Sequence, residues 1–254
     1  MAVPIASLTP LRFANGSASY TSPTGDQILG SVNGPVEVTR RDAQKPEEAT
    51  LEIIVKPGVG GSGVGERYVE GIIRSVLSRV ILMRDKTLAR RAIVVTLVVV
   101  KNTIAEGRVD ERGGSYLPIL PSLLHTALLS LLSAAIPMSM IYTAVLVAVN
   151  PCSDLIPNPS PNAARSASSL HVLAFSSQGH LLLNESQGDF DLATWEKIHD
   201  LAETVCRGGT KMQLTTGGDV SMDDTDTPQS LEQFVRGIVE DKAREEFAWK
   251  LVAT

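Results

Sequence analysis

Residues 117–149 read LPILPSLLHTALLSLLSAAIPMSMIYTAVLVAV and contain no Asp, Glu, Lys or Arg. An apolar run of this length is long enough to span a membrane as a helix. Three prolines interrupt it, however, and its first half carries a thin polar stripe made of Ser122, Thr126, Ser130 and Ser133. Residues 141–149 are rich in β-branched side chains, which favour strands. We therefore predict a buried helix that ends near residue 134, followed by a buried strand over 141–149, and favour this over a membrane span.

Two strands and a helix are predicted upstream of this stretch. Residues 92–100 (AIVVTLVVV) form a β-branched run typical of a strand covered on both faces. Residues 66–83 place their apolar side chains on one face of a helix, and residues 51–55 form the strand before it. The segment 58–65 (GVGGSGVG) lacks the Lys-Ser/Thr ending of a phosphate-binding P-loop and the spacing of a dinucleotide-binding loop. We interpret it as a connector.

The N-terminal part of the chain is predicted to contain short antiparallel strands. Turn residues stand at 15–16 (NG), 23–26 (PTGD) and 33–35 (NGP). Residues 40–49 are polar and charged, and we interpret them as a solvated loop. Residues 1–10 are expected to be a tail, and they lack the charged and then apolar regions of an export signal.

The C-terminal part mixes an irregular segment, a hairpin and two helices. Residues 150–169 are rich in Pro, Asn and Ser and predict an irregular excursion, after which strands at 171–176 and 180–183 form a hairpin around Gln178-Gly179. Asp191 is a candidate N-cap for a helix that ends at Gly208. Residues 209–228 are expected to be a mobile polar insertion. Ser230 to Gln233 has the capping-box pattern and opens a last helix.

The composition restricts the function. A formal net charge of −5 argues against a chain that binds nucleic acid by itself, because affinity for phosphates comes mainly from clustered Lys and Arg. Two cysteines in 254 residues provide no disulfide framework, and the four histidines have no metal-ligand spacing. We expect no metal site, no cofactor and a reducing intracellular compartment.

Several segments together resemble the RNase PH family. Residues 15–35 are similar to the family's opening hairpin, which commonly ends in Gly-Pro, and Leu88-Ala89-Arg90 is similar to its Pro-Arg turn. The most specific match is Gly113-Gly114-Ser115, followed by a small-residue helix and AAIPM at 134–138, which resembles the family's DGGTR and IPM segments. The resemblance covers residues 11–206. It implies an α+β fold with two β/α layers, like domain 2 of ribosomal protein S5, in one domain over residues 11–254.

Active members of this family are phosphorolytic exoribonucleases, and their phosphate site is degenerate in this sequence. The family holds phosphate with a Gly-rich turn at a helix N-terminus and a bidentate arginine. Here the corresponding residues are Gly113, Gly114, Ser115 and Tyr116, so the arginine is replaced by a phenol. The family's acidic residue before the glycines is replaced by Arg112. The resemblance therefore implies that the fixed positive charge for phosphate is lost.

The family's catalytic carboxylates are also missing. By the resemblance they fall near Ala164 and Leu170, and no Asp or Glu occurs between Asp154 and Glu185. We interpret Asp154 as a turn residue in a Pro-rich loop. No catalytic residue is therefore predicted, although a phosphorolytic 3′-5′ exoribonuclease with divergent residues stays open as the alternative.

The resemblance is strongest to non-catalytic subunits of the RNA exosome ring, and this implies both partners and a location. The partners would be other RNase PH-like subunits in a hexameric ring, S1/KH cap subunits, an associated hydrolytic nuclease and single-stranded RNA, without a membrane. The location would be the nucleus and nucleolus, and also the cytoplasm. The candidate RNA contacts are Arg84, Lys86, Arg90, Arg91, Arg108 and Arg112, for which a solvated loop surface is the alternative.

Overall fold

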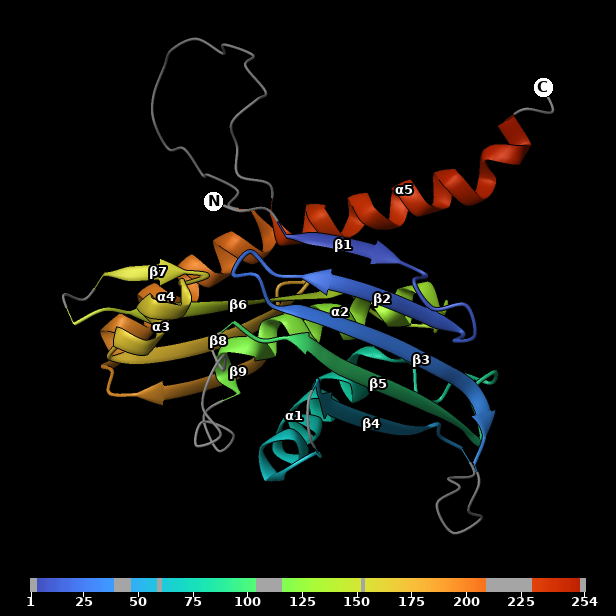
Figure 1. The fold of residues 1–254 in the computed structure, drawn as a ribbon, viewed down its shortest axis with the longest axis horizontal. Coiled ribbons are helices and arrows are strands. Elements are labelled where there is room, and N and C mark those ends of the chain that lie inside the picture. The colour runs from blue at the N-terminus through green and yellow to red at the C-terminus, as the bar shows by residue number, and fades with distance from the viewer. Residues whose placement is uncertain are drawn as a thin grey trace.

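The computed structural model describes residues 4–38, 47–58, 61–103, 116–151, 154–208 and 230–251, and it contains two β-sheets with a helix between them (Figure 1). The first sheet has the spatial order β1 (Ile5–Leu8), β2 (Gly16–Thr21), β3 (Gln27–Glu37), β5 (Arg91–Lys101) and β4 (Thr50–Pro57). The second has the order β7 (Leu155–Pro157), β6 (Tyr142–Val149), β8 (Ser169–Ser176) and β9 (Leu181–Gly188). The predicted α+β architecture with two β/α layers is confirmed.

The apolar stretch forms the centre of the molecule. A short 3-10 turn, η3 (Leu117–Ile119), leads into α2 (Leu120–Ser133), and β6 follows. Helix α2 contacts β2 and β3 on one side and β6 on the other, and every residue of β6 is buried. Both faces of the stretch are thus covered by protein, which explains why it carries no charge. No helix among the described residues combines the length and the apolar character that a membrane crossing requires.

The polar stripe of α2 faces the glycines of the first sheet. The Thr126 hydroxyl donates to the carbonyl of Ser122, and the Ser130 hydroxyl donates to the carbonyl of Thr126, each at 2.7 Å. A Cβ added at Gly30 would lie 2.4 Å from Ser130 Oγ. Thr126 and Ser130 satisfy their hydrogen bonds within the helix, and their small side chains allow α2 to approach the sheet closely.

Helix α1 (Val64–Val80) connects the parallel pair β4 and β5, as a crossover connection requires. The helix was predicted to continue to residue 83, but it ends at Val80. Ile81 instead forms an antiparallel bridge with Met138, and the Leu82 N–H donates to the carbonyl of Pro137 at 3.1 Å. The backbone after Val80 therefore pairs with a distant segment, which ends the helix earlier than its apolar pattern indicates.

Two N-terminal expectations need correction. Ile5–Leu8 lies in the expected tail but forms the edge strand β1 and pairs with β2, because Ala6 and Leu8 pack against the main core. The expected turn at 33–35 lies inside β3 as a β-bulge, since the register with β5 shifts between Asn33 and Val36. Pro35 has no N–H to donate to the neighbouring strand, and a β-bulge is one of the places in a sheet where a proline is tolerated.

The predicted C-terminal hairpin and two helices are present, although the second strand of the hairpin is longer than predicted. The excursion at 150–169 contains β7 and a short helix, α3 (Pro161–Ser166), and the hairpin predicted at Gln178-Gly179 joins β8 and β9. Helix α4 (Leu192–Arg207) has Asp191 as its N-cap and Gly208, where φ is 77°, as its C-cap. The capping box opens α5 (Leu231–Leu251), because Ser230 and Gln233 exchange backbone-to-side-chain hydrogen bonds at 3.3 Å. The predicted insertion at 209–228 lies outside the described residues.

Candidate functional site: a closed phosphate position

Tyr116, which the resemblance aligns with the family arginine, is bound to the first turn of α1. Its hydroxyl donates a hydrogen bond to Glu66 Oε1. The Tyr116 ring also packs on the helix backbone, since a Cβ added at Gly65 would lie 2.4 Å from its Cε2 atom. The other carboxylate oxygen, Glu66 Oε2, accepts from the Gly63 N–H at 2.7 Å. Glu66 is 6% exposed, so the position holds a phenol and a buried carboxylate.

This arrangement opposes the binding of an anion. A phosphate site needs converging N–H donors and a fixed positive charge. The Tyr116 hydroxyl is already used in its hydrogen bond to Glu66, so it is not available to an anion, and a phenol provides no positive charge. Arg112, Gly113, Gly114 and Ser115, the remaining residues of the degenerate site, lie outside the described residues.

The two positions that the resemblance assigns to the family's carboxylates hold apolar side chains. Ala164 is buried in α3. Leu170 lies in β8 and packs against the main core, to which Tyr116 also packs. Asp154 is exposed beside β7. Ala164 and Leu170, the positions that the resemblance assigns to the family's carboxylates, are therefore apolar packing residues in this structure.

The described basic candidates lie far from Tyr116. Arg84, Lys86 and Arg90 are exposed on the connection from α1 to β5, and Arg91 begins β5. Glu66 is in the first turn of α1, whereas this connection follows its last turn. Because α1 has 17 residues, its ends are separated by about 25 Å. The structure therefore separates the basic group from Glu66 and Tyr116.

Within the basic group the environments differ. Arg84 forms an exposed ion pair with Glu48 at 3.0 Å. Arg90 adopts a left-handed backbone with φ 63°, and Arg91 lies opposite Glu37 in the β3–β5 ladder. Leu88, which is buried, anchors this connection on the core. Arg108 and Arg112 lie outside the described residues.

The sequence did not single out the buried titratable groups. His125 in α2 is 3% exposed, and burial lowers its pKa to about 4. His171 forms hydrogen bonds through both ring nitrogens, with Ser186 Oγ at 2.8 Å and with Ser169 Oγ at 2.9 Å. Burial raises the pKa of the Cys206 thiol to about 12. The described part of the chain contains no cluster of three or more His, Cys, Asp or Glu side chains arranged to hold a metal ion.

Removal of the Tyr116 hydroxyl tests whether this contact is structural. The Tyr116→Phe variant is expected to lower the free energy of unfolding by about 2 kcal/mol, because it removes a hydrogen bond to a buried carboxylate. Urea denaturation followed by circular dichroism measures the change. The matched control is Tyr68→Phe on α1, where the side chain is 63% exposed and little change is expected. Equal effects of the two substitutions would contradict a structural role for the Tyr116 hydroxyl.

The fold is that of an RNase PH-like protein, and the comparisons with known proteins agree. The chain is 28% identical to Exosome complex component RRP46 of Saccharomyces cerevisiae over 204 residues, which is 78% of this chain and 87% of that protein. The crystal structure of rice (Oryza sativa) Rrp46 matches with a TM-score of 0.67 and 22% identity, over 78% of this chain and 86% of that one. The predicted resemblance is therefore confirmed.

More distant solved structures share the fold at lower identity. An Archaeoglobus fulgidus exosome with RNA bound to the active site matches with a TM-score of 0.61 at 10% identity, over 80% of this chain and 84% of that one. An archaeal exosome core matches with a TM-score of 0.62 at 10% identity, over 80% of this chain and 82% of that one. No family model matches the chain.

Proposed function

We propose that this chain is a non-catalytic structural subunit of an RNA exosome ring that supports 3′-to-5′ RNA processing and degradation. The observation that carries the proposal is the closed phosphate position, where Tyr116 binds the buried Glu66 carboxylate. Similarity to RRP46 and the shared fold of archaeal exosome chains support the assembly. The subunit's role is to scaffold the ring and to guide RNA toward a nuclease.

The partners follow from the same proposal. The chain packs with other RNase PH-like subunits in a hexameric ring, beneath S1/KH cap subunits and together with a hydrolytic nuclease. Its net charge of −5 makes unaided binding of RNA unfavourable, so RNA contacts depend on the assembled ring. The complex works in the nucleus, the nucleolus and the cytoplasm.

The catalytic prediction is tested with phosphate as the nucleophile. The purified chain is expected to release no nucleoside diphosphates from single-stranded RNA in phosphate buffer with magnesium, because Tyr116 provides no positive charge and its hydroxyl is bound to Glu66. Chromatography of the products measures the release. Turnover that survives removal of contaminating nucleases and disappears in Asp154→Ala would favour the alternative of a divergent phosphorolytic enzyme.

Restoring the family arginine provides a second arm of this test. In Tyr116→Arg the new guanidinium lies beside Glu66, and we expect it to form an ion pair with that carboxylate rather than bind phosphate. The variant should therefore remain inactive. A gain of phosphorolysis from this one substitution would show that only the arginine was missing and would contradict the closed-site interpretation.

The exposed basic group is expected to contact RNA only in the ring. Phosphate contacts position RNA without reading its sequence, and each lost contact lowers the slope of log affinity against log salt by about 0.7 for a single strand. We therefore expect the double variant Lys86→Gln/Arg91→Gln to reduce this slope in a reconstituted ring. Fluorescence anisotropy across a salt series measures it.

A matched pair of neutralisations controls for overall charge. Arg67 and Arg74 are exposed on α1, and their replacement by glutamine removes the same charge from the helix surface. This control should leave the slope unchanged. If Lys86→Gln/Arg91→Gln behaves like the control, these residues belong to a solvated surface, which is the alternative interpretation of the basic group.

A further inference from the structure

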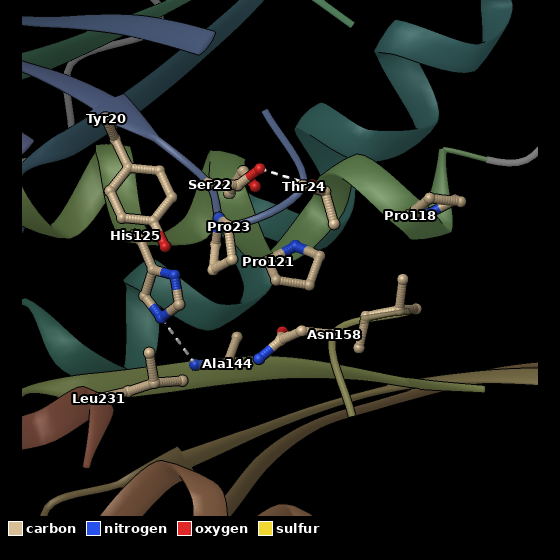
Figure 2. A pocket seen from close by; sticks show the side chains of 12 residues that line it. Tyr20, Ser22, Pro23, Thr24, Pro118, Pro121, His125, Ala144, Asn158 and Leu231 are labelled. Atoms are coloured by element: carbon tan, nitrogen blue, oxygen red, sulfur yellow. Dashed lines mark hydrogen bonds between the residues drawn. The ribbon is translucent and has the colours of Figure 1, made fainter. Parts of the chain in front are cut away.

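A small cavity lies where the two sheets meet the beginning of α2 (Figure 2). Its wall includes Ser22 and Thr24 from the β2–β3 turn, Ser122 and His125 from α2, Ala144 from β6, and Asn158. Its volume is about 30 Å³. Because one water occupies roughly 10–15 Å³ on this measure, the cavity has room for about two water molecules.

His125 presents a hydrogen-bond donor without a protein partner to this cavity. Its Nε2 atom accepts from the Ala144 N–H at 3.1 Å, so Nε2 carries no proton and the neutral ring has its hydrogen on Nδ1. Nδ1 is buried, and no hydrogen-bond partner for it occurs among the described residues. Figure 2 shows the imidazole beside Tyr20, with its lower nitrogen joined to Ala144. A buried donor left without an acceptor costs about 1–3 kcal/mol.

The opposite wall offers acceptors and disfavours an anion. The hydroxyls of Ser22 and Thr24 lie 2.6 Å apart, and both bond to the carboxylate of Asp26, which is 1% exposed. Their hydrogens are therefore engaged with each other and with Asp26. Ser22 Oγ also accepts from the Asp26 N–H at 3.1 Å, and the remaining lone pairs of the two hydroxyls are available. The negative charge of Asp26 behind this wall repels an oxyanion. A neutral molecule that both accepts and donates hydrogen bonds matches the lining.

We propose that this cavity is a binding site for ordered water. One water oxygen accepts from His125 Nδ1–H, and the water hydrogens point to the hydroxyl and amide oxygens of the lining. Two to four polar partners are what a buried water normally has. The water thereby links α2 to the β2–β3 turn and to the segment that follows β7, across the junction of the two sheets.

A crystal structure of the full chain, at a resolution that shows ordered solvent, tests this site. The expected result is a density peak within hydrogen-bonding distance of His125 Nδ1 in crystals grown from two different buffers. His171 is the internal control, because both of its ring nitrogens already bind serine hydroxyls and no water is expected there. An empty cavity, a protein atom bonded to Nδ1, or density that changes with the buffer would overturn the proposal.

A cavity-filling variant provides a second test of the water site. In Ala144→Val the added methyl groups enter the space that the water occupies, and the peak at Nδ1 is expected to disappear. If the peak persists unchanged in the folded variant, the water is not in this cavity. If this variant fails to fold, the crystal structure of the unmodified chain is by itself the test of the proposal.

Discussion

Replacing Gly16 by alanine is expected to lower the free energy of unfolding by about 3 kcal/mol, the upper end of ordinary overpacking costs. An added Cβ would lie 2.3 Å from the backbone nitrogen of Ala134 and 2.5 Å from the carbonyl oxygen of Ser130. Backbone atoms cannot move aside as a flexible side chain does, so β2 or the end of α2 must shift. Since the free energy of unfolding of native proteins is about 5–15 kcal/mol, this loss is a large share of it.

Gly71→Ala is the matched control for this prediction. Gly71 lies on the exposed face of α1, and an added Cβ meets no atom within 4 Å. Alanine there should stabilise the protein by up to about 1 kcal/mol, because glycine disfavours a helix interior. Urea denaturation of both variants measures the contrast. A destabilisation of similar size at both positions would show that the close approach of β2 to α2 is not the cause.

Mild acid is expected to destabilise the protein through His125. Burial depresses the folded-state pKa of this histidine from 6.5 to about 4, so the unfolded chain binds the proton more readily. The contribution of the neutral His125 to the free energy of unfolding is therefore complete above about pH 6.5, declines as the pH falls, and is lost below about pH 4. At pH 5 the expected loss is about 2 kcal/mol relative to neutral pH. Denaturation at several pH values measures it.

The histidine contribution is separated from that of other groups by substitution. His125→Gln removes the titrating group, and its free energy of unfolding should fall less between neutral pH and pH 5 than that of the parent chain. His180→Gln, at an exposed residue next to the β8–β9 turn, should leave the parent's pH dependence unchanged. An identical pH dependence in His125→Gln and the parent would assign the acid sensitivity to carboxylates instead.

Much of the fold was predictable because its signals are local. The helix and strand of residues 117–149, the crossover from β4 through α1 to β5, and the caps at Asp191 and Ser230 each depend on patterns within a few residues. The segments that carry the family resemblance are local in the same way. They predicted the RNase PH-like fold that the comparisons confirm.

The site depended on contacts between distant residues, for which a local pattern contains no signal. The sequence by itself, through its resemblance to the family, predicted that an arginine and the neighbouring carboxylates are missing, since that prediction depends on residue identity alone. Only the tertiary structure decided that Tyr116 binds Glu66, fifty residues away, and that the basic group lies at the other end of α1. It also decided that β1 joins the sheet, that the stripe on α2 faces glycines, and that His125 borders a cavity. Each of these depends on how whole elements pack, because packing brings together side chains whose separation in the chain does not reveal their distance in space.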